Sequence, residues 1–316
     1  MIMKAVRFHN VGGPEVLRLE EVEIPTPAAG QVRLRVTASA FNAADNGMRA
    51  GFLPIPISLP HIPGYDVSGV VDALGAGVTG LEVGQGVIGF LPMEADGGAA
   101  EYVVAPAAAL VTAPHSVPLA DAAALPSVAL TAWQALFNDG RLHAGQRLLI
   151  VGAGGAVGGH AIRLARRAGA HVIATASSRS VAAVAAAGPD VIIDHAAQSL
   201  LDAVTEPVDV LLNLAPLDPE EFASLVALVR DGGTVVSTTA FMTTPSDETR
   251  GVRAATVFVR ANRERLAQIV RLVDAGELVA GVDRRIGLDG LPALHAEASE
   301  GRIAGKVVVL ASADAR

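Results

Sequence analysis

Leu148-Leu-Ile-Val-Gly-Ala-Gly-Gly-Ala-Val-Gly158 decides how this 316-residue chain is built. The stretch opens with a continuously apolar strand and continues, from Val157 to Ala168, with the spacing of a helix. Gly152, Gly155 and Gly158 punctuate the turn between them. Such a turn has to be tight, has to let a diphosphate approach the backbone, and has to let the helix pack close to the strand. A glycine-rich turn without a ligand is the alternative, but the strand–turn–helix context favours a dinucleotide site at the helix end.

The chain downstream of this turn alternates between strands and helices. Val181–Ala187 and Glu220–Arg230 have helical composition, and apolar strand segments flank them. These strand segments are Val172–Thr175, Val191–Ile193, Val208–Asn213 and Thr234–Ser237. Continuously apolar strands separated by helices are typical of a parallel sheet covered on both faces, which predicts an α/β doubly wound domain.

The first third of the chain has a different character. Short segments with β-type alternation, cut by Pro and Gly, predict a β-rich, partly closed domain. These segments are Lys4–Phe8, Gln31–Val36, Val67–Leu74 and Val87–Phe90. Helical segments at Pro118–Leu125 and Val128–Phe137 mark a break near residue 118, and after a further helix at 262–276 the chain returns to β character in Gly305–Leu310.

The composition excludes several classes of function. The formal net charge is −8 and the basic runs are no longer than pairs of arginines, whereas nucleic-acid binding needs clustered Lys and Arg. The chain contains no cysteine, which excludes disulfides, thiolate nucleophiles and Cys-ligated zinc. No apolar stretch approaches the roughly 18 residues of a membrane span, and the N-terminus does not have the pattern of a signal sequence. We expect a soluble cytoplasmic protein with neither nucleic acid nor membrane as a partner.

The end of the second strand of the α/β domain selects the dinucleotide. An NAD site places Asp or Glu there to bind the ribose hydroxyls, but Ala174–Ser180 contains no acid. Ser177 and Ser178 can donate hydrogen bonds, and Arg179 can pair with a 2′-phosphate. An ordinary surface arginine is the alternative, but the segment as a whole predicts NADPH.

Several motifs together resemble one family. They are Asn42-Ala-Ala-Asp45, His61-Ile-Pro-Gly-Tyr-Asp-Val-Ser-Gly-Val-Val71, Gly77–Val87, Gly97–Val104, the Gly152–Gly158 turn and Gly305-Lys306. In this order they resemble the medium-chain dehydrogenase/reductase superfamily, specifically its zinc-independent quinone-oxidoreductase branch. The resemblance implies a GroES-like β-rich catalytic domain made from residues 1–119 and 263–316, and a Rossmann NADPH-binding domain at 120–262. It also implies a homodimer that pairs through the edge strand of the Rossmann sheet, Ala255–Val259.

The zinc-binding members of this superfamily hold a catalytic metal with Cys, His, Glu or Asp side chains. By resemblance, the corresponding positions here are Asn42, Tyr65 with Asp66, and Ser127, and the four-Cys structural lobe is missing. A single Asp among neutral neighbours cannot build a tetrahedral zinc site. We therefore expect no metal, and without a Lewis acid we do not expect alcohol dehydrogenation.

The zinc-free branch implies hydride transfer to a small-molecule acceptor, either a quinone or the activated C=C bond of an enone or enoyl compound. By resemblance, Asn42 and Tyr65 are the catalytic candidates: Asn42 would hold the ribose or the substrate carbonyl, and Tyr65 would donate a proton. Asp45, Thr131 and Phe258 are expected in the nicotinamide and substrate pocket. A core aromatic is the alternative for Tyr65, and a helix N-cap or loop-fixing residue is the alternative for Asp45. The run Asp45-Asn-Gly-Met48 lacks the Tyr that many quinone reductases carry there, which leaves the identity of the acceptor open.

The predicted cofactor contacts end strands or begin helices on the ligand side of the sheet. They are Gly152, Gly155, Ala156, Val157, Gly158, Ser177, Ser178, Arg179, His195, Leu214, Ser237, Thr238, Val259 and Lys306. His195 is expected near the 2′-phosphate, with an exposed surface loop as the alternative. Two other functions stay open: a non-catalytic NADPH-binding or redox-sensing protein, and an enoyl-thioester reductase of polyketide or fatty-acid metabolism, which would need a wide basic entrance.

Overall fold

The computed structural model describes residues 1–239, 241–303 and 305–312. The chain divides into two compact units: Met1–Ser127 together with Ala261–Arg316 form the first, and Val128–Arg260 form the second. The first boundary lies at Ser127 instead of residue 119, because helix α2 (Leu119–Ala122) and the alanines after it pack against strands of the first unit. Residues 313–316, which the predicted first domain includes, lie outside the described residues.

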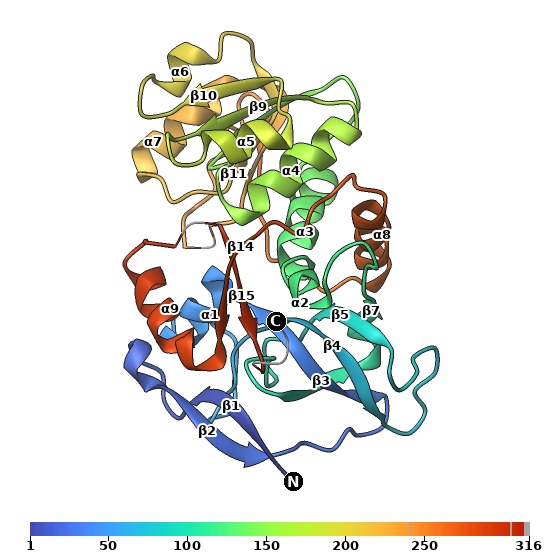
Figure 1. The fold of residues 1–316 in the computed structure, drawn as a ribbon. Helices are drawn as coiled ribbons and strands as arrows, with labels where there is room; N and C mark the ends of the chain where they lie inside the picture. Colours follow the sequence, from blue (N-terminus) through green and yellow to red (C-terminus); the bar gives the residue numbers. More distant parts are fainter. Residues whose placement is uncertain (240, 304, 313–316) are drawn as a thin grey trace. The chain divides into compact units, whose positions relative to one another are not determined.

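A parallel sheet forms the centre of the second unit (Figure 1). Its strands follow the order β10-β9-β8-β11-β12-β13, and each neighbouring pair is parallel. Their bounds are β8 Arg147–Val151, β9 His171–Ala176, β10 Val191–Asp194, β11 Val208–Asn213, β12 Val229–Ser237 and β13 Arg253–Thr256. This is the doubly wound Rossmann order, which confirms the predicted fold class. The strand order reverses between β8 and β11, so a ligand of such a sheet binds beside the carboxyl end of β8.

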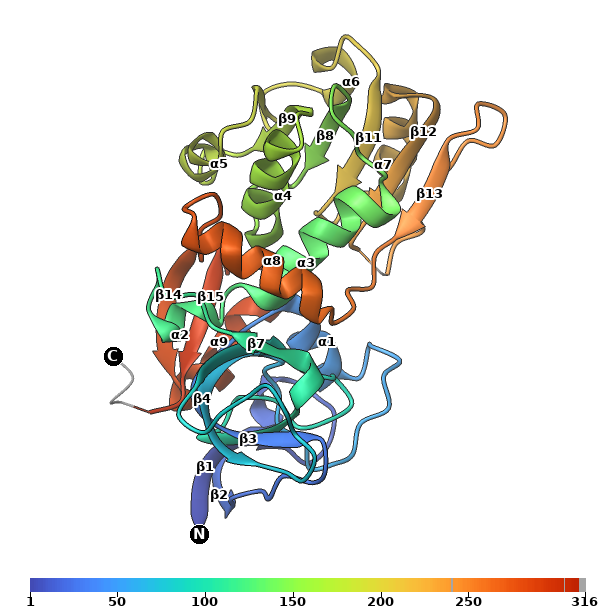
Figure 2. The same cartoon turned by 90° about the vertical axis from the view of Figure 1, so that its right-hand side faces the viewer.

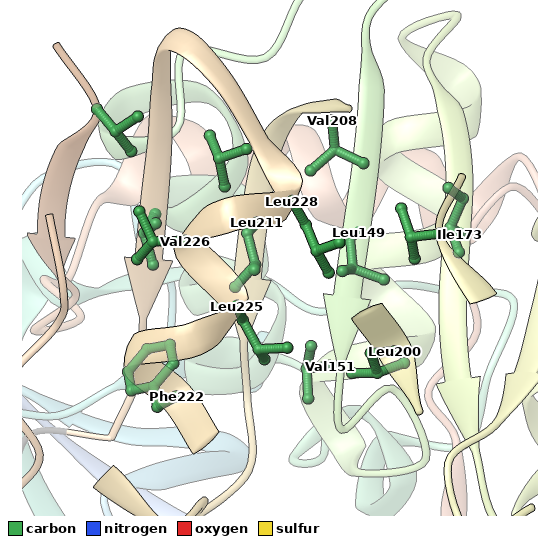
Figure 3. Packing of buried hydrophobic residues seen from close by; sticks show 14 of the residues in the cluster. Leu149, Val151, Ile173, Leu200, Val208, Leu211, Phe222, Leu225, Val226 and Leu228 are labelled. Carbon is green, nitrogen blue, oxygen red and sulfur yellow. The ribbon is translucent and has the colours of Figure 1, made fainter. Parts of the chain in front are cut away.

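Helices cover both faces of this sheet (Figure 2). Their bounds are α4 Ala156–Arg167, α5 Val181–Ala187, α6 Leu200–Ala203 and α7 Pro219–Ser224. α4 and α5 pack against β8, β9 and β10. The other face packs against α6, α7 and the 3-10 turn Leu225–Leu228, as the apolar cluster in Figure 3 shows. Leu149 and Val151 of β8 belong to that cluster, and the residues that alternate with them face the opposite side, which explains why the strand is apolar throughout.

A mostly antiparallel sheet, to which both chain ends contribute, forms the centre of the first unit. Its strands follow the order β14-β15-β3-β4-β5-β7, β6 also pairs with β3, and β1 and β2 form a separate antiparallel pair. Their bounds are β1 Ile2–Phe8, β2 Leu17–Glu23, β3 Gln31–Ala40, β4 Asp66–Leu74, β5 Gly86–Phe90, β6 Tyr102–Pro106, β7 Leu110–Thr112, β14 Val282–Gly287 and β15 Lys306–Leu310. β15 runs antiparallel to β3 with Val308 opposite Ala40, and this register brings the start of β15 beside the end of β3.

The helices of the first unit include α1 at Ala43–Ala50, α8 at Arg263–Asp274 and α9 at Leu291–Ser299. α3 (Pro126–Trp133) spans the boundary between the units, and a π-helical segment, Gln134–Asp139, follows it. Among the described residues, no helix has both the length and the hydropathy to cross a membrane.

Several elements differ from the sequence-based prediction, and three of them have a clear position in the fold. α2 is shorter than Pro118–Leu125, because Leu125 precedes a proline and that position disfavours helix. The helix predicted at Glu220–Arg230 ends at Ser224, since Val229 already pairs with Val208 in the sheet. The edge strand β13 covers Arg253–Thr256 instead of Ala255–Val259.

Candidate functional site

The glycine turn after β8 combines three closely packed glycines, Gly152, Gly154 and Gly158, with one open glycine, Gly155. Gly152 has a φ of 80°, and a Cβ there would lie 2.7 Å from the Cβ of Ala215. A Cβ on Gly158 would lie 2.0 Å from the carbonyl oxygen of Ala153. The nearest atom to a Cβ on Gly155 is instead 3.8 Å away, so the space beside this residue is open. Gly155 is the N-cap of α4, which leaves the first N–H groups of that helix directed at this open space.

The strands of the second unit end in register beside this turn. Val151 of β8 pairs with Asn213 of β11, Asn213 with Ser237 of β12, and Ser237 with Thr256 of β13. Ser237 is buried, and its hydroxyl lies 2.7 Å from that of Thr239. The hydroxyl of Ser237 is therefore hydrogen-bonded within the sheet. The other predicted cofactor contacts here, Leu214 and Thr238, are half-buried.

Two of the polar groups at this edge were not predicted from the sequence. The side chain of Asn213 is buried between Ser237 and Thr239. The hydroxyl of Thr175 in β9 accepts a hydrogen bond from Gly152 N at 2.9 Å and so fixes the glycine turn. Small polar residues at the carboxyl ends of apolar strands are the sequence signal for both.

The loop after β9 offers a cationic group to an anionic ligand. Ser177 N donates to the hydroxyl of Ser180 at 3.0 Å, which closes a turn and leaves Ser178 and Arg179 exposed. Within residues 1–239, 241–303 and 305–312, Arg179 has no ion-pair or hydrogen-bond partner. His195 is also exposed, and it follows β10, whose last residue pairs with Ala176 at the end of β9. Arg179 and His195 therefore follow neighbouring strands at one sheet edge, where an anionic group would meet both side chains.

These residues fit a bound nicotinamide dinucleotide. The open space at Gly155 is the gap that a side chain would fill, and the start of α4, with Ala156 and Val157, supplies unpaired N–H groups for the diphosphate. Asp194 of β10 is the acidic residue that pairs with Ala176 at the end of β9. Its side chain accepts a hydrogen bond from Ala196 N at 3.0 Å.

Thr131, Phe258 and Val259 lie in the second unit. Thr131 is half-buried on α3, and the side chain of Phe258 is 59% exposed. The side chain of Gln134 holds the backbone of residues 258–260. Its Nε2 donates to Phe258 O at 3.2 Å, and its Oε1 accepts from Arg260 N at 3.3 Å.

A buried polar cluster in the first unit joins Asn42, Asp66, Ser127 and Lys306, which we call the Asp66 cluster. Asp66 is 0% exposed and Lys306 is 3% exposed. Lys306 Nζ lies 3.1 Å from Asp66 Oδ2, and it also donates to Asn42 Oδ1 and, at 3.2 Å, to the carbonyl oxygen of Phe41. Lys306 is also one of the predicted cofactor contacts, and its three N–H donors are all used within this cluster.

The carboxylate of Asp66 is saturated by the other members of the cluster. Its Oδ2 accepts from Asn42 Nδ2 at 3.0 Å and from Ser127 Oγ at 2.6 Å, and its Oδ1 accepts from Ser127 N at 2.7 Å. The amide of Asn42 is also satisfied internally, since its oxygen faces Lys306 and Ser127. Asn42 therefore has its main polar atoms committed within the first unit.

Asp45 fixes the loop that carries Asn42. Its Oδ2 accepts from Asn42 N at 2.8 Å, and its Oδ1 accepts at 2.9 Å from the N–H of Gly64, whose φ is 93°. Burial raises the pKa of the Asp45 carboxyl to about 6, against the opposing effect of these two N–H groups. This geometry matches the loop-fixing alternative for Asp45.

Tyr65 is buried, with 1% of its surface exposed, and its hydroxyl lies 2.8 Å from Nε2 of His61. The phenol and the imidazole therefore share one buried hydrogen bond. Burial raises the pKa of Tyr65 and lowers the pKa of His61, so both groups are neutral near pH 7. This geometry favours the core-aromatic alternative over proton donation.

The comparisons with known proteins agree on one group of enzymes. The profile of a family described as alcohol dehydrogenase GroES-like domain matches residues 28–115, and one described as zinc-binding dehydrogenase matches residues 187–309. The chloroplastic quinone-oxidoreductase QR1 of Triphysaria versicolor is 31% identical over 98% of this chain and 98% of its own. A chloroplast envelope quinone oxidoreductase homolog of Arabidopsis thaliana is 36% identical, over 61% of each chain.

Two further proteins extend this comparison. A chloroplastic NADPH-dependent alkenal/one oxidoreductase of Arabidopsis thaliana is 30% identical over 89% of this chain and 72% of its own. The solved structure of the quinone oxidoreductase from Coxiella burnetii superposes with a TM-score of 0.90 at 28% identity, over 98% of this chain and 99% of that one.

The residues of the Asp66 cluster do not fit the zinc that one family description names. Zinc is held by thiolates, imidazoles and carboxylates, and the cluster offers a single carboxylate that already accepts four hydrogen bonds. The ammonium of Lys306 lies among the same atoms and would repel a divalent cation. Among the described residues, no group of three or more His, Asp and Glu side chains is arranged to hold a metal ion.

Proposed function

Because the chain belongs to the medium-chain dehydrogenase/reductase superfamily, in its quinone-oxidoreductase branch, we propose that it is an NADPH-dependent oxidoreductase that works without zinc. The proposed acceptor is a quinone or the activated C=C bond of an enone or enoyl compound. The names of the relatives, which include quinone oxidoreductases and an alkenal/one oxidoreductase, support this range of acceptors.

The observation that carries the cofactor proposal is the partnerless, exposed Arg179 after β9, within the part of the chain that the structure describes. A guanidinium is well suited to a phosphate because it presents several N–H donors in a fixed plane. NADH has no 2′-phosphate, and an NAD site would use a carboxylate where this chain has Ala176 and Ser177. We expect His195 to add a second, weaker contact from the end of β10.

The Asp66 cluster supports the choice of acceptor. Activation of an alcohol at neutral pH calls for a Lewis acid or a strong base, and the charges of Asp66 and Lys306 neutralise each other. A quinone or a conjugated carbonyl needs less help, because its own carbonyl takes up the electron pair. NADPH supplies a hydride when it is bound, and the chain has to orient the two reactants and exclude water.

Steady-state oxidation of NADPH and NADH by the full chain tests the proposal. The acceptor panel contains benzoquinones, alkenals, enoyl thioesters and simple aldehydes. We expect turnover with quinones or alkenals, little with simple aldehydes, and a higher kcat/KM for NADPH. Arg179→Gln should remove about tenfold or more of the preference for NADPH over NADH, as expected for loss of one charge-assisted phosphate contact.

A matched control variant accompanies this test. Arg167→Gln removes an arginine at the other end of α4 and should leave the ratio of NADPH to NADH activity unchanged. A preference for NADH in the wild-type chain would contradict the cofactor proposal. Turnover confined to enoyl thioesters would favour the thioester-reductase function instead.

A non-catalytic NADPH-binding protein is the second candidate, and one observation favours it. The polar atoms of Asn42 and Tyr65, the catalytic candidates, are committed to Lys306, Ser127 and His61. Tight NADPH binding without turnover of any acceptor would support this candidate. In the catalytic proposal, hydride transfer takes place without water, the reduced product takes up its proton from solvent after it leaves the site, and Tyr65 keeps His61 in place.

A cytoplasmic location and a homodimer through β13 stay predictions of this proposal. β13 is the edge strand of the Rossmann sheet and is mostly exposed, so its outer backbone groups are available for pairing. Light scattering of the purified chain would measure the oligomeric state, and a monomer would contradict the prediction.

A further inference from the structure

We propose that Lys306 is a built-in cation that replaces a metal in the Asp66 cluster. By resemblance, Asn42, Asp66 and Ser127 stand at metal-ligand positions of zinc-binding relatives, and the structure brings the three side chains together around one ammonium group. The inference goes beyond the proposed function, because it concerns what holds this site together and keeps metals out.

The N–H donors of Lys306 match its oxygen acceptors one to one. The ammonium of Lys306 has three N–H donors, and it has three oxygen acceptors: Asp66 Oδ2, Asn42 Oδ1 and Phe41 O. A buried carboxylate needs a compensating charge and hydrogen bonds on its remaining lone pairs, and Asp66 receives both. Without the ammonium, Asp66 would be a buried anion held only by neutral donors.

The choice of lysine is itself informative in this chain. Of its 24 Lys and Arg residues, only Lys4 and Lys306 are lysines, and Lys4 is exposed. An arginine presents a planar fork that suits two-point contacts, whereas lysine presents a compact point charge with three donors spread in a cone. Three oxygens gathered around one point need the second geometry, which also resembles that of a coordinated metal ion.

The cluster also joins segments that are far apart in the sequence. Lys306 opens β15, Asp66 opens β4, Ser127 lies in α3 and Asn42 precedes α1. Lys306 is therefore a positioning residue: it fixes the amide of Asn42 and, through it, the start of the loop that Asp45 also holds.

Chemical rescue of Lys306→Ala tests this inference. The truncation leaves a cavity of the shape of a propylammonium ion beside Asp66. We expect Lys306→Ala to melt at a lower temperature than the wild-type chain, and propylammonium chloride to raise its Tm by about 2–4 °C or more above the effect of sodium chloride. Lys4→Ala, which alters the other lysine, should show no such difference between the two salts.

Two further measurements keep the inference testable if Lys306→Ala folds poorly. The double variant Asp66→Asn/Lys306→Met removes both charges, and it should melt at a higher temperature than Lys306→Met alone. Wild type dialysed against zinc chloride should hold no more zinc than Asp66→Asn does. Equal effects of the two salts on Lys306→Ala would overturn the inference, and so would one zinc per chain that is lost in Asp66→Asn. None of these readouts requires turnover, so they stand apart from the proposed function.

Discussion

The titration of Asp45 provides a test of how burial and hydrogen bonding compete in this site. Two backbone N–H groups, of Asn42 and Gly64, favour the carboxylate, whereas complete burial favours the neutral acid. Lys306 lowers the pKa of Asp45 and Asp66 raises it, both by smaller amounts. Asp45 and His295 both line one small cavity. Burial lowers the pKa of His295 to about 3, so its imidazole stays neutral above pH 4.

Burial outweighs the two hydrogen bonds in setting the pKa of Asp45. The pKa of Asp45 rises from its ordinary value of 3.8 to about 6 in the folded chain, because desolvation outweighs the N–H groups. At about 1.4 kcal/mol for each pKa unit, this corresponds to roughly 3 kcal/mol. The folded state holds the proton more tightly than the unfolded state, so the stabilisation is fully present below pH 3.8 and is lost as pH rises through about 6.

Asp45→Asn isolates this effect, because an amide does not titrate. The variant loses one of the two backbone hydrogen bonds, which costs about 1–3 kcal/mol at every pH. The wild-type chain should therefore exceed the variant in stability near pH 4, and this margin should shrink by roughly 2–2.5 kcal/mol on going to pH 7.5. Urea unfolding followed by circular dichroism measures it, since the single tryptophan, Trp133, lies in the second unit and does not report on Asp45. A margin that stays constant or grows with pH would refute the reasoning, because the N–H groups would then outweigh burial.

Three other predictions follow from the geometry of the site. Tyr65→Phe should keep kcat within about tenfold of wild type and lower the Tm, because the phenol binds His61; a loss of about 100-fold or more in kcat, typical of a missing general acid, would restore Tyr65 as the proton donor. Gly155→Val should keep the wild-type Tm but weaken NADPH binding about tenfold or more in fluorescence titration, because its side chain would enter the open space at the start of α4. Gly158→Ala should instead destabilise the fold by about 1–3 kcal/mol, because its Cβ meets the Ala153 carbonyl; equal stability of the two glycine variants would contradict this distinction.

The sequence predicted those features that depend on neighbours in the chain. The glycine turn after Leu148–Val151 identified the dinucleotide-binding unit, because the tight turn, the open backbone and the close helix each require glycine at a fixed place. The apolar strands between helices predicted the doubly wound sheet, which the strand order confirms. The absence of cysteine limits the metal chemistry from the sequence alone. Element ends were less predictable: the helix predicted to reach Arg230 stops at Ser224, because pairing of Val229 with β11 outweighs helix propensity.

Only the tertiary structure decided what the polar residues of the first unit do. Asn42, Tyr65 and Lys306 each had a predicted role toward cofactor or substrate, and the structure shows which side chains they bind: Asn42 and Lys306 bind Asp66, and Tyr65 binds His61. A lysine that opens the otherwise apolar strand β15 is a sign of a buried partner, but the sequence does not name that partner. The periodicity of apolar residues indicates which face of a strand is buried, but it does not indicate which distant segment packs against that face. The register of β15 on β3, with Val308 opposite Ala40, is what delivers the ammonium of Lys306 to Asp66 and gives this site its internal cation.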